Sequence, residues 1–309
     1  MDDLLGRDGH RGRNGNDGRD GQDLSVDDTH GITVLDRPMS RPIRKDERIV
    51  ADRGLYIESW LPERRSRRKP LYLLHGELGG SWLWHRFLGF FAPRGWEGHA
   101  LNLRGHYWSD TADLGDLDFS TYLDDVVAGT STMSRPPIVI GHGLGGLLAM
   151  KLAETRPVSA LILLSSAMPA ELLEPPPSHI VRLLPRQYKR ELLDWDGSLE
   201  VLQHQNPDLT TADVMRVQHM MGIESGSARR QMLEGVSVSL AELPAVPMLV
   251  IGAGLDRFFP EPDSERLAEW LGADYQPFGA HSHYGLVTGE ESYEQVAEAI
   301  RAFLESHRL

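Results

Sequence analysis

The feature that most constrains the fold is an alternation of short apolar runs with longer segments whose apolar residues recur at helical spacing. The apolar runs lie at residues 48–52, 55–61, 70–74, 98–103, 137–140, 159–165, 247–252 and 274–278. Helical spacing marks residues 82–93, 118–130, 145–153, 261–271 and a last segment that holds Val296, Ile300 and Phe303. Short apolar strands that alternate with amphipathic helices are typical of a mostly parallel sheet covered on both faces. The sequence therefore predicts an α/β fold with a doubly wound sheet.

One long stretch interrupts this alternation. Residues 168–240 contain a triple proline at 175–177 and several helical segments, but no run typical of a strand, and the sheet pattern resumes at Val246. We expect this stretch to be a helical cap inserted between two sheet strands. It would cover the carboxyl edge of the sheet, where a doubly wound fold places its site. The core then consists of residues 41–167 and 241–309.

The first 40 residues have a different pattern. Glycine occupies positions 6, 9, 12, 15, 18 and 21, a period of three that resembles collagen. The repeat is short, it lacks proline, and its other positions are mostly charged or amide residues. It also resembles calcium-binding β-roll repeats, without their stacked apolar residue. We expect residues 1–40 to be a disordered tail.

Charge and composition exclude several classes of function. The formal net charge of −13 argues against nucleic-acid binding, which needs a basic face. The chain has no cysteine, which suits a cytoplasmic location, and it lacks an apolar run long enough to span a bilayer. No apolar signal-peptide core follows the N-terminus. We therefore expect a small-molecule substrate, with no membrane and no nucleic-acid partner.

The chemistry is indicated by the residues that follow the strand at 137–140. Positions 141–145 read Gly-His-Gly-Leu-Gly, where a common hydrolase signature reads Gly-x-Ser-x-Gly. The frame of a nucleophile elbow is present, but Gly143 stands where the reactive serine would be. Glycine tolerates the strained backbone of such a turn, but it cannot attack a substrate.

Four segments together resemble the α/β-hydrolase superfamily, and the resemblance covers residues 45–307. Residues 74–82 resemble the His-Gly loop after the third strand, and residues 103–110 resemble the Arg-Gly-His-Gly-x-Ser-Asp loop, with Tyr107 in place of glycine. Residues 141–146 resemble Gly-His-Ser-Met-Gly-Gly. Residues 254–256 and 279–283 resemble the loops that deliver the acid and the histidine. The resemblance implies an α/β-hydrolase fold with an inserted cap, and it does not by itself fix the reaction.

The resemblance also implies a set of catalytic residues. His283 would be the general base, with His281 as its competitor two residues earlier, and Asp256 would orient and stabilise the imidazole. The backbone N–H groups of Glu77 and Leu144 would form an oxyanion hole. The alternative for the histidine–aspartate pair is a relic hydrogen bond that holds two loops together.

The remaining candidates line the expected pocket. They are His75, Gly76, Trp82, His142 and His281, with His142 expected to be structural. The side chain of Glu77 would be an acid or base with a pKa raised by burial, or it would face solvent or pair with an arginine. The histidine spacing shows no metal-binding pattern, so we expect neither a metal nor a cofactor.

Three functions fit these residues. The first is a non-hydrolytic enzyme that uses the dyad and oxyanion hole for cyclisation, elimination or decarboxylation of an apolar carbonyl compound. The second is an ester, amide or C–C hydrolase, which would use activated water or would have lost its serine by design. The third is a non-catalytic ligand-binding relative. The sequence favours the first, because His283 and Asp256 are both retained beside the elbow that lacks its serine.

Overall fold

The structure is a computed structural model that describes residues 43–309, apart from positions 51, 65 and 175. The predicted tail, residues 1–40, lies outside the described residues. The described residues belong to one compact unit, which holds both the sheet and the segment predicted to be a cap.

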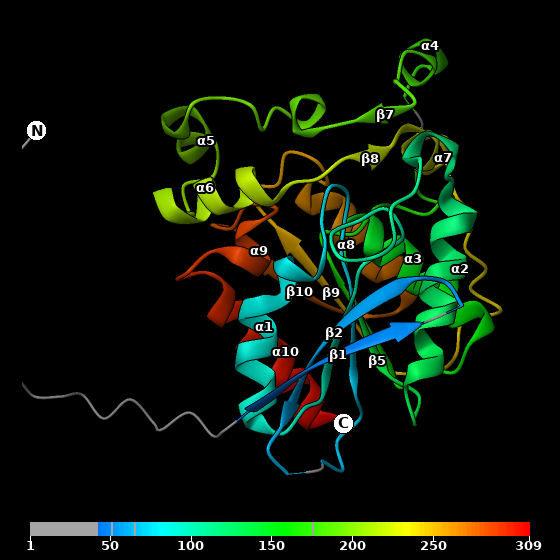
Figure 1. Cartoon of the computed structure of the whole chain (residues 1–309), viewed down its shortest axis with the longest axis vertical. Helices are drawn as coiled ribbons and strands as arrows, with labels where there is room; N and C mark the ends of the chain where they lie inside the picture. Colours follow the sequence, from blue (N-terminus) through cyan, green and yellow to red (C-terminus); the bar gives the residue numbers. More distant parts are fainter. Residues whose placement is uncertain (1–42, 51, 65, 175) are drawn as a thin grey trace, which may run out of the picture. The chain divides into compact units, whose positions relative to one another are not determined.

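A central sheet of eight strands organises this unit, in the order β1-β2-β4-β3-β5-β6-β9-β10 (Figure 1). Its strands are β1 (Ile43–Val50), β2 (Leu55–Pro62), β3 (Leu71–Leu74), β4 (Gly98–Leu101), β5 (Ile138–His142), β6 (Ala160–Leu164), β9 (Met248–Ala253) and β10 (Asp274–Phe278). The β1–β2 and β2–β4 pairs are antiparallel, and all other pairs are parallel. The mostly parallel α/β sheet predicted from the sequence is confirmed.

The helices follow the strands in the expected alternation. The α-helices outside the cap are α1 (His85–Phe91), α2 (Phe119–Gly129), α3 (Leu144–Thr155), α8 (Glu261–Leu271), α9 (Gly285–Thr288) and α10 (Tyr293–Ser306). Short 3-10 helices span Ser81–Trp84, Ala92–Arg94, Leu114–Asp116 and Thr130–Thr132. The helix expected at 82–93 is thus divided. Its start is drawn into a tighter turn, because the Ser81 N–H and hydroxyl groups donate to Asn102 and Glu58.

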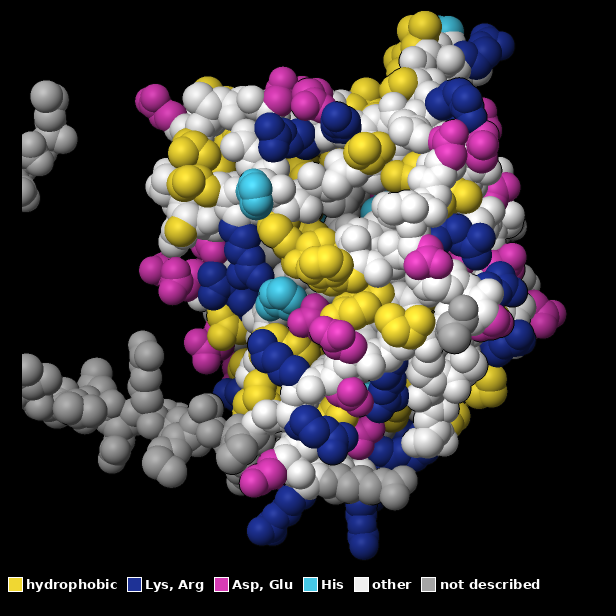
Figure 2. Space-filling view, viewed as in Figure 1, with side chains coloured by type: hydrophobic (Ala, Val, Ile, Leu, Met, Phe, Trp, Pro, Cys, Tyr) yellow, Lys and Arg dark blue, Asp and Glu magenta, His cyan; other side chains and the backbone are white. Residues whose placement is uncertain are grey.

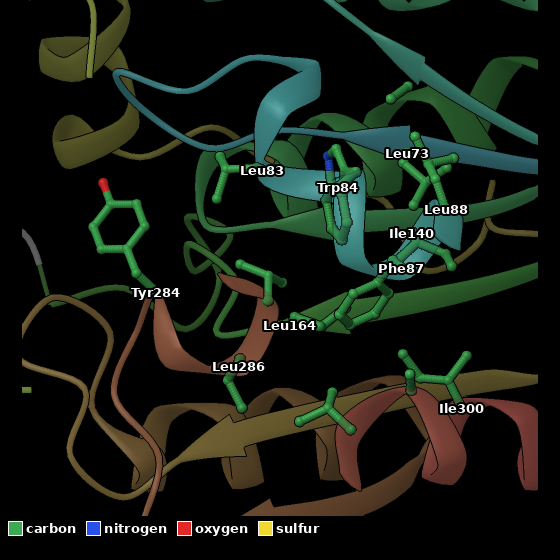
Figure 3. Close-up of a cluster of buried hydrophobic side chains, with 14 of the residues drawn as sticks. Leu73, Leu83, Trp84, Phe87, Leu88, Ile140, Leu164, Tyr284, Leu286 and Ile300 are labelled. Carbon is green, nitrogen blue, oxygen red and sulfur yellow. The ribbon is translucent and has the colours of Figure 1, made fainter. Parts of the chain in front are cut away.

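Alternate side chains of each strand enter two separate hydrophobic clusters. Leu71 and Leu73 join the cluster with helices α1 and α10, whereas Tyr72 and Leu74 join the cluster with helices α2, α3 and α8. Figure 3 shows part of the first cluster, which includes Leu73 of β3 with Phe87 and Leu88 of α1. Opposite faces of a strand alternate in this way because its side-chain period is two. Burial of each large apolar side chain contributes roughly 1.5–3 kcal/mol to stability.

The residues between β6 and β9 add no strand to the main sheet. They form α4 (Ser178–Arg182), α5 (Leu199–Gln205), α6 (Thr211–Met220), α7 (Gly226–Glu234) and a 3-10 turn at Arg190–Leu193. The sequence indicated no strand here, but β7 (Gln187–Tyr188) and β8 (Glu224–Ser225) form a short antiparallel pair. Figure 1 shows these elements above the carboxyl ends of the parallel strands. We call residues 168–240 the cap below.

Strand order places the functional loops. The chain runs from β3 outward to β4, then returns to the other side of β3 for β5, so the direction of winding reverses between β3 and β5. Ligands of open α/β sheets bind beyond the carboxyl ends of strands at such a reversal. The loop after β3 contains Gly76 and Glu77, and the loop after β5 contains Gly143.

Within the described part of the chain, no helix combines the length and the apolar content that crossing a bilayer requires.

Candidate active site

The turn from β5 into α3 has the backbone geometry of a nucleophile elbow. Gly143 is the N-cap residue of α3, with φ 56° and ψ −121°. A side chain strains a backbone at positive φ by on the order of 1–3 kcal/mol, whereas glycine adopts it readily. The turn is also tightly packed, since a Cβ on Gly145 would lie 2.3 Å from the Leu74 carbonyl oxygen. The sharp turn therefore forms with glycine at the position that the resemblance assigns to the nucleophile.

The predicted base and acid are hydrogen-bonded to each other. The His283 Nδ1–H group donates to Asp256 Oδ2 over 2.7 Å, and both side chains are buried. Asp256 Oδ1 accepts the backbone N–H groups of Phe258 at 2.7 Å and Phe259 at 3.0 Å. Burial alone would raise the pKa of Asp256, but its interaction with the His283 imidazole and these hydrogen bonds bring it below its usual value. Asp256 is thus held as an anion that fixes the tautomer of His283.

The imidazole of His283 faces the elbow. A Cβ built on Gly143 would lie 3.4 Å from His283 Nε2, 3.4 Å from Cε1 and 3.4 Å from Cε2 of Phe259. Because Nδ1 is bound to Asp256, Nε2 is the ring nitrogen that accepts a proton from a group above the elbow. The rings of Phe258 and Phe259 lie 5.3 and 5.4 Å from the imidazole and give the site an apolar wall.

His142 supports this imidazole from below. Its ring lies 4.0 Å from that of His283, and its Nε2–H group donates to the His283 carbonyl oxygen over 3.0 Å. Burial, and then the neighbouring charge of His283, hold the pKa of His142 well below its usual value. A neutral, fully buried ring suits the structural role expected for His142.

The resemblance assigns an oxyanion hole to two backbone N–H groups, those of Leu144 and Glu77. Leu144 is the first residue of α3, and the first N–H groups of a helix have no acceptor within it. The positive end of the helix dipole adds to their attraction for an anion. Glu77 lies in the loop after the neighbouring strand β3. The two groups therefore belong to loops on either side of the point where the winding reverses.

The side chain of Glu77 is engaged by the cap. Its Oε1 accepts a hydrogen bond from Arg229 Nη1 at 2.6 Å and another from the Tyr188 hydroxyl group. This is the pairing with an arginine that the sequence left open, and it balances the charge of the Glu77 carboxylate. The Arg229 contact keeps the guanidinium charged, because the Glu77 charge raises the pKa of Arg229 against the opposing effect of burial.

The other predicted pocket residues are all buried, but their contacts differ. His75 donates from Nδ1 to the Gly76 carbonyl oxygen at 2.8 Å, and burial lowers the pKa of His75 to about 4. Trp82 is almost completely buried beside the same loop. His281 contacts the Ser292 carbonyl oxygen at 3.2 Å through Nε2. The structure therefore brings His283 to Asp256 and gives His281 a different partner.

Sequence reasoning missed a buried charged network that joins the cap to the core. Glu224 of β8 accepts hydrogen bonds from His106 Nε2 at 3.1 Å and from the Tyr122 hydroxyl at 2.6 Å. It also accepts the backbone N–H of Leu78 at 3.0 Å, one residue after Glu77. The network fixes β8 of the cap against the loop that carries Glu77.

The geometry indicates that His106 is a cation. Its Nδ1 lies 3.0 Å from the Arg104 carbonyl oxygen, and its Nε2 faces Glu224, so both ring nitrogens donate. Burial opposes the charge, but the carboxylate of Glu224 raises the pKa of His106 above its ordinary 6.5. Burial alone would raise the pKa of Glu224. The charge of His106 and the hydrogen bonds from His106 and Tyr122 outweigh this effect and lower the pKa of Glu224 from 4.5 to about 2.

These shifts predict how the pair contributes to stability. The stabilisation from Glu224 is fully present above about pH 4.5 and is lost as the pH falls toward 2. The stabilisation from His106 is fully present below about pH 6.5 and declines as the pH rises through its raised pKa. We expect Glu224→Gln to lower the free energy of unfolding by about 1–3 kcal/mol, most strongly between pH 4.5 and 6.5. Urea unfolding at several pH values measures this difference. Glu242→Gln, at an exposed position, is the control, and an equal loss at all pH values would contradict the ion pair.

The described residues contain no group of three or more His, Asp or Glu side chains arranged to hold a metal ion.

The fold and this arrangement of loops define a known class. Residues 71–299 match the family described as "Alpha/beta hydrolase family", and the chain belongs to it. Among curated proteins it is similar to Esterase PIR7B of Oryza sativa subsp. japonica, with 28% identity over 109 residues, 34% of this chain and 41% of that protein. It is also similar to a pyrethroid hydrolase of Sphingobium wenxiniae, with 29% identity over 107 residues, 34% of this chain and 38% of that protein. The matches thus span about two fifths of these relatives.

Solved structures agree on the fold. An esterase from Exiguobacterium antarcticum superposes with a TM-score of 0.63 at 17% identity, over 81% of this chain and 95% of that one. A thermophilic esterase superposes with a TM-score of 0.62 at 15% identity, over 86% of this chain and 98% of the other. At such identities the likeness shows the fold alone.

Proposed function

We propose that this protein is a hydrolase of apolar carboxylic esters in which the His283–Asp256 dyad activates water directly. The observation that carries the proposal is the position of His283 Nε2, 3.4 Å from the point above Gly143 where a serine Cβ would lie. The curated relatives carry esterase and hydrolase names, which supports hydrolysis over the cyclisation, elimination or decarboxylation favoured by the sequence. The apolar Phe258 and Phe259 rings beside His283 support an apolar substrate.

The reaction needs only groups that the site supplies. As the oxygen of a water molecule bonds to the ester carbonyl carbon, one of its protons passes to His283 Nε2. The carbonyl oxygen takes the negative charge, which the N–H groups of Leu144 and Glu77 stabilise. The bond between carbon and the alcohol oxygen then breaks, and His283 returns the proton to the departing alkoxide. The products are the acid and the alcohol, and no covalent enzyme intermediate forms.

Asp256 and Arg229 balance the charges that are present or develop during these steps. Asp256 stabilises the imidazolium during the reaction, and its own hydrogen bonds to backbone N–H groups keep it ionised. Arg229 neutralises Glu77, so the carboxylate does not oppose the negative charge that develops at the neighbouring oxyanion position.

Turnover of a chromogenic ester tests the proposal. We expect the full chain to hydrolyse p-nitrophenyl esters of medium-length acids at a steady rate from the first turnover, since no acyl-enzyme accumulates. Intact-mass analysis after rapid quenching should find no acyl adduct. A rate that does not exceed the uncatalysed one would identify a non-catalytic relative, and an acyl adduct would show that another side chain is the nucleophile.

A further inference from the structure

The loop between β2 and β3 forms a concave basic surface on a protein that is acidic as a whole. Three adjoining cavities of about 570, 450 and 370 Å³ follow this loop, and neighbouring cavities share lining residues. We call them together the basic groove. Its cationic lining residues are Arg44, Arg48, Arg64, Arg67, Arg68, Lys69, Arg135 and Arg308. Its acidic lining residues are Glu63, Glu97 and Glu305.

The groove lies away from the candidate active site. The loop enters β3 at its amino end, whereas the catalytic loops leave the parallel strands at their carboxyl ends. Figure 2 shows dark blue side chains projecting from the lower edge of the molecule, where Figure 1 places the β2–β3 loop. A ligand bound here would not compete with an ester at His283.

Some of the cations give the groove its shape. Arg135 donates to the carbonyl oxygens of Arg67 at 2.8 Å and Arg68 at 2.5 Å, which fixes the course of the loop. Arg68 lies 3.7 Å above the ring of Trp96 and donates to the Leu309 carbonyl oxygen at 3.2 Å. These contacts position the backbone of Arg67 and Arg68, so this part of the groove does not need to be ordered anew when a ligand binds.

The other cations are available to a ligand. Among the described residues, no side-chain hydrogen bond or ion pair engages Arg44, Arg64, Arg67, Lys69 or Arg308. Like charges gathered along one groove repel one another, and the eight cationic lining residues outnumber the three acidic ones, even with Asp46 4.0 Å from Arg48. The groove therefore carries a local excess of positive charge that an anion would compensate.

The side-chain chemistry indicates the kind of anion. Arginine and lysine together are the usual ligands of phosphate groups, and guanidinium groups bind two phosphate oxygens at once. Cations spread along adjoining cavities fit several linked phosphates better than a single one. None of the lining residues is aromatic, so the groove offers no platform on which a base would stack.

We propose that the basic groove is a binding site for linked phosphate groups, such as a polyphosphate chain or the phosphate tail of a nucleotide. This site is independent of the ester hydrolysis proposed above, and either one can fail without the other. Recognition is by charge and bidentate hydrogen bonding, without contacts to a base.

Calorimetric titration of the full chain with tripolyphosphate tests this site. We expect micromolar binding at about 50 mM salt that weakens at least about tenfold at 200 mM, because the contacts are ionic. The triple variant Arg64→Gln/Arg67→Gln/Lys69→Gln should lose at least about tenfold in affinity. The control Arg156→Gln/Arg182→Gln/Lys189→Gln removes the same charge from exposed positions elsewhere and should bind as the native chain does. A loss shared equally by both variants would mean a general charge effect and would overturn the site.

Comparing the affinities of different phosphate compounds shows whether the groove recognises linked phosphates alone or a nucleotide. Equal affinity for tripolyphosphate and ATP, with inorganic phosphate at least about tenfold weaker, supports recognition of linked phosphates alone. ATP or a single-stranded oligonucleotide that binds at least about tenfold more tightly than tripolyphosphate would overturn the base-free assignment in favour of a nucleotide or nucleic-acid site. Absence of binding at about 1 mM tripolyphosphate in low salt would overturn the proposal as a whole.

Discussion

Replacing Gly143 with serine is expected to convert this chain into a covalent esterase. The elbow already has the backbone angles of the nucleophile position, and a Cβ there would make only van der Waals contact, at 3.4 Å, with His283 and Phe259. The hydroxyl of Gly143→Ser would then lie within reach of His283 Nε2. We expect hydrolysis of an activated ester to rise by on the order of 100-fold or more, with a burst of product equal to one acyl group per chain.

Gly143→Ala is the matched control for this gain. It introduces the same Cβ at positive φ without a hydroxyl group, so both variants should lose on the order of 1–3 kcal/mol of stability. The alanine methyl group would also occupy the space that the proposed water uses, so its ester hydrolysis should fall below that of the native chain. Stopped-flow absorbance and intact-mass analysis measure the burst and the acyl adduct. If the serine variant were no faster than the alanine variant, the dyad would not be aligned with the elbow.

The comparison of these variants also addresses why glycine stands here. A serine at this position would be reactive but would strain the backbone, whereas glycine adopts these backbone angles without strain. The turn at Gly143, the ionised Asp256 and the pairing of Glu77 with Arg229 would all favour the charge development that the proposed hydrolysis requires.

The parts of this site that the sequence predicted are those encoded by local signals. Each strand is a short apolar run, and His283, Asp256 and Gly143 each follow such a run in a loop whose composition is distinctive. Because parallel strands end at one edge of the sheet, the order of the loops was enough to bring these residues together. The hydrogen bond between His283 and Asp256 joins residues 27 positions apart, and no local pattern encodes a contact at that separation. This pairing was predicted from the resemblance to a family.

The contacts that the sequence could not predict lie between the cap and the core. Glu224 and His106 are 118 positions apart, and Arg229 and Glu77 are 152 apart. In the sequence, a charged residue of the cap looks the same whether its side chain faces solvent or is buried. Only the packing of β8 and α7 on the loops after β3 and β4 selects these four residues, so their role follows from tertiary structure alone.

Replacing His283 with alanine is expected to abolish most of the native activity. Ester hydrolysis should fall by about 10²–10⁴-fold, which is the usual contribution of a general base, because no other described side chain pairs with Asp256. Asp256→Asn should act in the same direction, since a neutral amide no longer fixes the tautomer or stabilises the imidazolium.

His281→Ala is the discriminating control for this loss. His281 lies two residues away and is buried to a similar degree, but its Nε2 contacts the Ser292 carbonyl oxygen. Its removal should therefore change stability and leave the rate of ester hydrolysis within a few-fold of the native chain. Steady-state rates of folded variants, with folding checked by circular dichroism, separate the two histidines. If the two variants lost activity equally, the loss would come from a disturbed loop, and His283 would have no special part in moving the proton.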